Sequence, residues 1–360
     1  MMVDGNRVLT YQDFVKGLDA KGNFVHRVIN LATQDNEMLD DMTVIEANNG
    51  TTLETKFRTE TSKPVWTTYY QGIPASKGSK ARLKVATGKM GTKIVVDCEL
   101  FDKAMKRGQG YADAVLEDEI TSKKDGMRME MGNTLIYGKL ANEPRSFNGL
   151  FEHYNLCGAE GEMDDKKSEF YVLNAMGVGG GAKKASEDAL GSIALVTWSP
   201  DTITAFHAEN AETGGITMSE RIKGNEVDED NGGTYLAYTQ YLYWELGLAV
   251  RDFRAGGRIA NIQRDDMLSH AAGEDPKQAA MRYVELIDRL TCRVHEGGRQ
   301  AIYMDRLMWE KYRTLYTRIT RGNAFTEEQV GAMKRRTLNG IPVRVQDCMK
   351  INEEKVAQAA

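Results

Sequence analysis

Residues 176–186, MGVGGGAKKAS, are the stretch whose residue types come closest to a phosphate-binding loop. Gly177, Gly179 and Ala182 fit the loose form of the dinucleotide fingerprint. Such a site needs a helix that is long enough to cover a sheet, because the helix N-terminus supplies the N–H groups for the pyrophosphate. Only about two helical turns fit before Gly191, and no GxxxxGK sequence followed by Ser or Thr is present. We interpret residues 177–182 as a connecting loop, with a nucleotide-dependent enzyme as the alternative.

Other residue types that could do chemistry are scattered. Four cysteines lie far apart without a CxxC pair, which is typical of a reduced compartment: Cys98, Cys157, Cys292 and Cys348. His153 lies four positions before Cys157, but further ligands at zinc spacing are missing nearby. The acidic run Asp164–Asp165 lacks the spacing of a calcium loop, and GxSxG and HExxH are absent. We therefore expect no catalytic residues, no cofactor and no metal.

Length and charge narrow the class of protein further. A chain of 360 residues is long enough for about two domains. The net charge of −5 argues against a protein that coats nucleic acid, because such proteins are usually basic. No apolar stretch approaches the roughly 18 residues that span a bilayer, and the N-terminus has no apolar core of a signal peptide. We expect synthesis in the cytoplasm and no membrane contact.

Two stretches alternate with a period of two. They are TTLETKFRT at 51–59 and KARLKVA at 80–86, and this period predicts two strands. The segment between them is rich in turn residues and too long for a tight turn. We interpret 51–97 as a long two-stranded ribbon. Because a lone ribbon is marginal in water, it needs its own core or another copy of the chain to lie on.

The ribbon segment also contains three aromatic residues, Trp66, Tyr69 and Tyr70. Exposed aromatic side chains often mark surfaces that bind a partner. Packing within the chain is the alternative.

Helical periodicity comes before and after the ribbon. The first 40 residues are loosely amphipathic and predict a helical segment. From Tyr111 to Tyr137, apolar residues recur at spacings of four and seven, which predicts one helix about 40 Å long. The residues of this stripe are Ala112, Leu116, Ile120, Met127, Met131 and Leu135.

The second half of the chain is rich in strand patterns and ends in a mixed α/β region. Residues 192–263 predict several strands. Asp275 and Pro276 predict the start of a helix, and Asp305 predicts the cap of a second one. We expect a loop over 320–339, a strand at IPVRVQD and a frayed tail at EEKVAQAA.

Five sequence stretches point to a known family. They are FNGLFEHYN at 147–155, SIALVTWSP at 192–200, GGTYLAY at 232–238, WELGLAVRDFRAGGRIANIQ at 244–263 and NGIPVRVQD at 339–347. Together they resemble the major capsid proteins of tailed bacteriophages, in a podovirus-type branch with the Hong Kong 97-type fold. The resemblance runs from about Thr10 to Val356, and RDFRAGGRIANI is its most specific stretch. Relatives often have Pro-Lys-Gly where this chain has Ala208–Glu209–Asn210.

The resemblance implies an α+β chain in six parts. These are an N-terminal arm over 1–50, an extended loop over 51–97, a spine helix over 98–140, a sheet-rich peripheral domain over 141–263, an axial domain over 264–337, and a C-terminal strand and tail over 338–360.

It also implies a structural protein and not an enzyme. Copies of the chain are expected to form pentamers and hexamers of an icosahedral shell around packaged double-stranded DNA, with portal, scaffolding and decoration proteins as further partners. The expected location is the virion capsid, after assembly in the host cytoplasm. A cargo nanocompartment with the same fold is the alternative. The expected contacts between subunits are Arg58, Trp66, Tyr69, Tyr70, Arg82 and Lys84.

Overall fold

The computed structural model describes residues 36–107, 109–158, 167–176, 178, 190–209, 215–227, 232–268, 275–319, 325–330 and 333–359. Residues 1–35 of the predicted helical arm and, apart from Val178, the Gly-rich loop at 177–182 therefore lie outside the described residues. Contacts divide the chain into two compact units. Of the described residues, the first holds 89–132 and 215–245, and the second holds the rest. No helix in the described ranges is long and apolar enough to cross a membrane.

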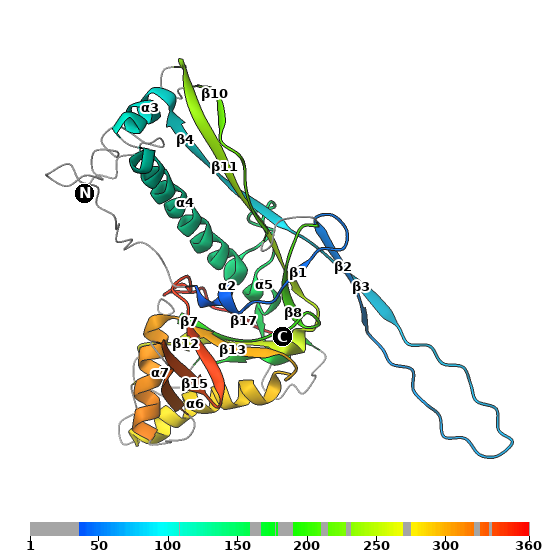
Figure 1. The fold of residues 1–360 in the computed structure, drawn as a ribbon. Helices are drawn as coiled ribbons and strands as arrows, with labels where there is room; N and C mark the ends of the chain where they lie inside the picture. Colours follow the sequence, from blue (N-terminus) through cyan, green and yellow to red (C-terminus); the bar gives the residue numbers. More distant parts are fainter. Residues whose placement is uncertain are drawn as a thin grey trace. The chain divides into compact units, whose positions relative to one another are not determined.

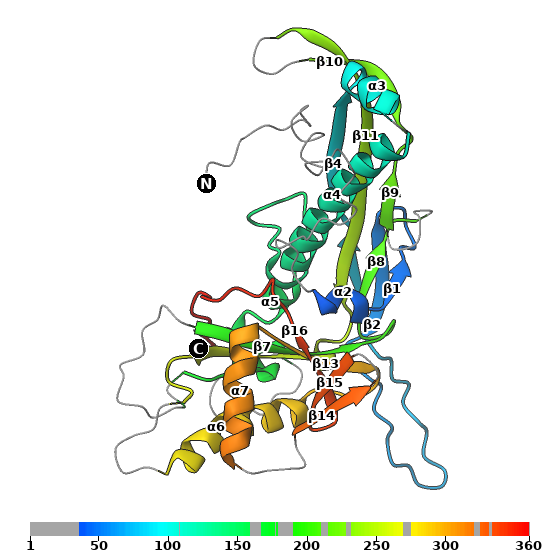
Figure 2. The same ribbon diagram turned by 60° about the vertical axis from the view of Figure 1, so that its left-hand side comes forward.

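The first unit packs helices against a small antiparallel sheet (Figures 1 and 2). Ile94 and Val96 lie in its core with Phe101, Ala104 and Leu116. The predicted stripe of the long helix is confirmed, since Leu116, Met127 and Met131 are buried. The elements are β4 Gly88–Asp97, α3 Cys98–Arg107, α4 Gln109–Tyr137, β9 Ile216–Met218, β10 Ile222–Val227 and β11 Thr234–Val250; the division between the units falls within α4 and β11.

A mixed sheet is the centre of the second unit. Its strands follow the order β6 Val172–Asn174, β12 Gly256–Gln263, β7 Leu190–Trp198, β13 Arg299–Met304 and β16 Ile341–Val345. Every residue of β7 and β12 is buried, which places these two strands in the core. At one end, β8 Ile203–His207 pairs in parallel with β1 Val44–Glu46 and antiparallel with the last residues of β11.

The two faces of this sheet have different covers, as two neighbouring glycines of β12 show. A Cβ atom on Gly257 would lie 2.6 Å from Leu290 Cδ1 of α6, and one on Gly256 would lie 2.5 Å from Tyr154 Oη, just after α5. Helices α6 Pro276–Arg293 and α7 Arg306–Ile319 therefore cover one face (Figure 1). The short helix α5 Leu150–His153 and the chain after it lie on the other.

Both predicted helix caps are confirmed. The Asp275 carboxylate accepts a hydrogen bond from the backbone N–H of Lys277 at 3.0 Å. The Asp305 carboxylate accepts one from the N–H of Met308 at 2.8 Å. These bonds satisfy N–H groups that have no partner within the helix.

Three predictions of local structure are wrong. Residues 88–97 do not extend the ribbon, because they form β4, which pairs with β11. The expected loop over 320–339 contains a hairpin of β14 Phe325–Val330 and β15 Met333–Leu338. The strands FTEEQV and MKRRTL have apolar residues only at their ends, so no alternation marks them in the sequence. The tail is also not frayed, since β17 Ala357–Gln358 pairs with β5 Leu156–Cys157.

The remaining short elements are α2 Glu37–Asp41, η1 Ser168–Tyr171 and η4 Phe253–Ala255.

Candidate intersubunit surface

The predicted ribbon forms and is rooted in the core of its own unit. Strands β2 Thr52–Arg58 and β3 Lys80–Ala86 pair antiparallel along their whole length. Near the root, Leu53 is buried and packs in one cluster with Phe206 and Ala249. The ribbon and the loop at its end project away from the sheet of their unit (Figure 1).

One face of the ribbon is apolar, and its cover ends near the root. Successive side chains of a strand point to opposite faces, so Leu53, Thr55 and Phe57 share a face. Leu53 is 3 % exposed, whereas Phe57 is 39 % exposed. The described parts of the chain therefore cover only the root of this face.

The other face carries mostly positive charge. Its cross-strand pairs are Glu54 with Lys84, Lys56 with Arg82, and Arg58 with Lys80. Lys84 Nζ lies 3.3 Å from Glu54 Oε1. The pKa of Glu54 is lowered, mainly by a hydrogen bond from the Asn49 side chain and also by the contact with Lys84. Of the predicted contact residues, Arg58, Arg82 and Lys84 therefore lie on one face, together with Lys56 and Lys80, which the prediction omitted.

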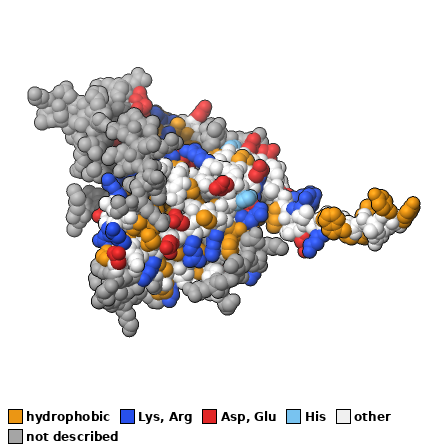
Figure 3. All heavy atoms as spheres, turned by 90° about the horizontal axis from the view of Figure 1, so that it is seen from below, with side chains coloured by type: hydrophobic (Ala, Val, Ile, Leu, Met, Phe, Trp, Pro, Cys, Tyr) orange, Lys and Arg blue, Asp and Glu red, His pale blue; other side chains and the backbone are white. Residues whose placement is uncertain are grey.

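The loop between the strands is uncovered. Trp66 and Tyr69 are 100 % and 97 % exposed, Tyr70 is fully exposed, and Ile73 and Val65 are also exposed. Figure 3 shows hydrophobic side chains along the projection at the right. The described chain provides no cover for these aromatic rings, so the alternative of packing within the chain finds no support in its residues.

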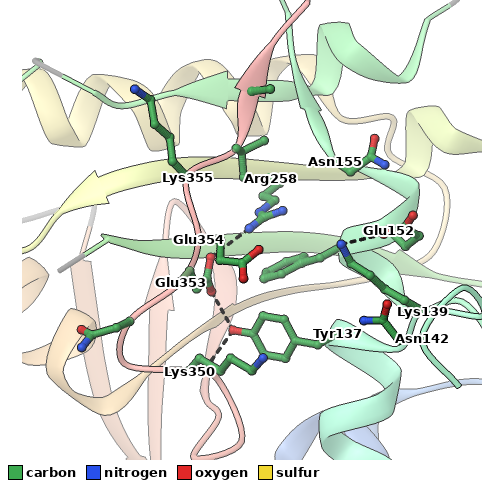
Figure 4. Close-up of a pocket in the computed structure, with 14 residues that line it drawn as sticks. Tyr137, Lys139, Asn142, Glu152, Asn155, Arg258, Lys350, Glu353, Glu354 and Lys355 are labelled. Atoms are coloured by element: carbon green, nitrogen blue, oxygen red, sulfur yellow. Dashed lines mark hydrogen bonds and ion pairs between the residues drawn. The ribbon is translucent and has the colours of Figure 1, made fainter. Parts of the chain in front are cut away.

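A buried polar cluster lies on the sheet face that faces α5 (Figure 4). Arg258 donates to Glu353 Oε2 at 2.8 Å and to Ser192 Oγ at 3.0 Å, and its guanidinium lies 3.8 Å from the centre of the Phe151 ring. The hydroxyl of Tyr137 donates to Glu353 Oε1 at 2.6 Å. Burial, reinforced by the Glu353 carboxylate, raises the pKa of Tyr137 and keeps this donor protonated. We call Arg258, Glu353, Ser192 and Tyr137 the Arg258 cluster.

Asn261 holds the same C-terminal segment a little further along. Its side chain accepts from the N–H of Val356 at 2.8 Å and donates to the C=O of Val356 at 3.0 Å. Asn261 has φ of 59° at a register shift of β12. Asn adopts this left-handed conformation more readily than most residues, because its short polar side chain can form hydrogen bonds with the nearby backbone. The Arg258 cluster and Asn261 together pin residues 353–356 to the sheet.

The cluster joins the C-terminal segment to β12, β7 and α4 through the side chain of Glu353. It borders an open pocket of about 510 Å³ lined by lysine, asparagine and glutamate side chains. The Ser192 hydroxyl donates a hydrogen bond to Glu353 Oε2 at 2.5 Å, and no histidine is among the described residues that line the pocket. Among the described residues, no group of three His, Cys, Asp or Glu side chains could hold a metal ion.

The family model of the major capsid protein GP7 matches residues 19–357. The chain belongs to this family. The capsid protein is thus a structural protein of a phage shell, located in the virion capsid, and not an enzyme. The alternative of a nucleotide-dependent enzyme is therefore wrong. No protein of curated function matches the sequence.

Solved structures show the fold. The capsid protein is similar to a chain of the bacteriophage Epsilon15 structure, with 22 % identity, a TM-score of 0.70, and coverage of 100 % of both chains. This confirms the predicted α+β, Hong Kong 97-type fold. The capsid of Myoviridae phage XM1 matches at 9 % identity and TM-score 0.39, over 72 % of this chain and 100 % of that one. The SrpI encapsulin of Synechococcus elongatus PCC 7942 matches at 10 % identity and a TM-score of 0.40, over 67 % of this chain and 92 % of that one. The TM-score of the encapsulin match is too low to support the alternative of a cargo nanocompartment.

Proposed function

We propose that copies of this capsid protein assemble into pentamers and hexamers of a closed icosahedral shell, and that the loop of each copy is buried on a neighbour. The uncovered loop is the observation that supports this most. Trp66, Tyr69 and Tyr70 expose whole aromatic rings to water, and large apolar side chains gain free energy when a partner covers them. Contacts that run from one copy to the next close into rings.

The proposed contact comprises Arg58, Trp66, Tyr69, Tyr70, Arg82 and Lys84. All six lie on the ribbon or its loop, and the loop is exposed from residue 59 to residue 77. Leu53 anchors the root of the ribbon in the core of its unit, so a contact of the loop with a neighbour would be connected to that core.

We further propose that the shell encloses double-stranded DNA, that it assembles in the host cytoplasm, and that portal, scaffolding and decoration proteins complete the particle. Membership of a major capsid protein family supports these partners. The proposed division keeps residues 1–50 as arm, 98–140 as spine and 338–360 as tail. The expected boundary between a peripheral domain over 141–263 and an axial domain over 264–337 does not follow the fold, because β7 pairs with both β12 and β13 in one sheet and residues 215–245 belong to the other unit. The extended loop is shortened to 52–86, because residues 88–97 form β4.

Shortening the loop tests the function. Replacing residues 59–79 by Asn-Gly joins Arg58 to Lys80 through a two-residue turn that fits their pairing. We expect a folded protein that forms no closed particles in negative stain, because the side chains that bridge to the neighbour are gone. Particles of normal size and yield from this variant would contradict the proposal.

A further inference from the structure

The charged face of the ribbon carries more positive charge than the described residues of its own chain neutralise. We define this face as Glu54, Lys56, Arg58, Lys80, Arg82 and Lys84, which are together on one side of β2 and β3. Its single acidic residue, Glu54, pairs with Lys84. For the other four side chains, the described residues provide no ion pair.

The register makes this excess unfavourable in an isolated chain. Lys56 lies directly opposite Arg82, and Arg58 lies directly opposite Lys80. Like charges at directly opposed positions destabilise an antiparallel pair. Carboxylates from another molecule would remove this repulsion.

The distribution of charge over the sequence indicates which molecule supplies them. Residues 51–88 contain seven Lys and Arg and two Asp and Glu, a net charge of +5. The whole chain has −5, so the remaining residues have −10. Every copy therefore offers a basic ribbon and an acidic body, which are complementary to each other.

A second copy fits this surface better than DNA does. Beyond the charged face, the same projection continues into Trp66, Tyr69 and Tyr70, which are uncovered. Phosphates would neutralise the basic residues, but a DNA backbone offers no apolar cover for these rings. A protein surface can do both, because interfaces combine an apolar core with a polar rim.

We propose that the charged face binds carboxylates on the acidic surface of a second copy of the chain. This inference rests on the proposed function and adds the chemistry of the contact. The loop supplies the apolar area, and the charged face supplies attraction and orientation as the two copies approach. Such attraction acts over about 8–10 Å at physiological ionic strength and weakens as salt rises.

A charge reversal separates the contact from the fold. Lys56→Glu places an acid opposite Arg82, so the dilute, unassembled protein should melt at the same temperature as the wild type or higher. Assembly should weaken, with half-assembly at about tenfold higher protein concentration and a shallower dependence on NaCl. Light scattering at several salt concentrations measures both quantities. Lys277→Glu is the matched control, because it changes the charge equally at an exposed position in the first turn of α6, where an acid is favourable.

The doubly reversed variant, Lys56→Glu with Arg58→Glu, decides the outcome. Failure to assemble below about 0.1 M NaCl, with an unchanged circular dichroism spectrum, is expected. Normal assembly with the wild-type salt dependence would overturn the inference. The proposed function would survive that result, because the shortened loop tests it separately. Normal particles that retain less nuclease-protected DNA would also overturn it, and would assign the charged face to DNA.

Discussion

Arg258 and Glu353 are 95 positions apart in the chain, yet their side chains meet at 2.8 Å inside the second unit. Each is almost fully buried, at 6 % and 5 % exposure. A buried charge without a partner is costly, so this pair ties the C-terminal segment to the central sheet. The folded end of the capsid protein therefore depends on a contact between β12 and the last ten residues.

Removing one partner of this pair should be severe. We expect Arg258→Met to lower the free energy of unfolding by about 3–5 kcal/mol, because Glu353 is then buried without its counter-charge. Urea denaturation of the dilute, unassembled protein measures the loss. Arg306→Met is the control, since Arg306 pairs with Asp347 at 2.9 Å but is 65 % exposed, and it should cost less than about 1 kcal/mol. Equal losses in the two variants would show that the Arg258 cluster is not a special anchor.

Asn261 allows the backbone and the side-chain contribution to be separated. Asn261→Gly keeps the left-handed φ of 59° but loses both hydrogen bonds to Val356, and we expect a loss of about 1–3 kcal/mol. Asn261→Ala should lose about 1–2 kcal/mol more, because its Cβ is strained at this φ. Hydrogen exchange at the Val356 amide should accelerate in both variants. Slow exchange in Asn261→Gly would mean that β17 alone holds the tail.

Periodicity carried most of the fold prediction. The long helix, the two ribbon strands and both Asp-capped helices follow from local patterns, because each pattern repeats over several residues. The wrong end of the ribbon shows the limit. Residues 80–86 and 88–97 are both strand-like, and the sequence does not tell that the second pairs with β11, more than a hundred residues later.

The Arg258 cluster also could not be predicted from the sequence, because its members are far apart in the chain. A glutamate in EEKVAQAA looks like a solvated charge, and only the fold shows that Glu353 meets Arg258. One signal did exist. RDFRAGGRIANI, the most specific stretch of the resemblance, holds both Arg258 and Asn261, together with the two glycines that allow close packing of the sheet.

The cysteines should differ in reactivity. Burial raises the pKa of the Cys348 thiol to about 12, and burial also raises the pKa of Cys98 and Cys157. Cys292 is exposed. Because the thiolate is the reactive form, we expect one thiol of the four to react with iodoacetamide at about pH 8 in the unassembled protein, and all four after unfolding. Cys292→Ser should abolish the reaction of the folded protein, and any thiol that still reacts fast in that variant would contradict the burial of the other three.

The central claim is that a neighbour covers the loop that the chain leaves exposed. Trp66 reports on it directly, because it is 100 % exposed while Trp198, Trp244 and Trp309 are at most 7 % exposed. Acrylamide quenching of tryptophan fluorescence should therefore be strong in the unassembled protein and weak in assembled particles, and Trp66→Phe should remove the difference. Equal quenching of Trp66 before and after assembly would contradict the account.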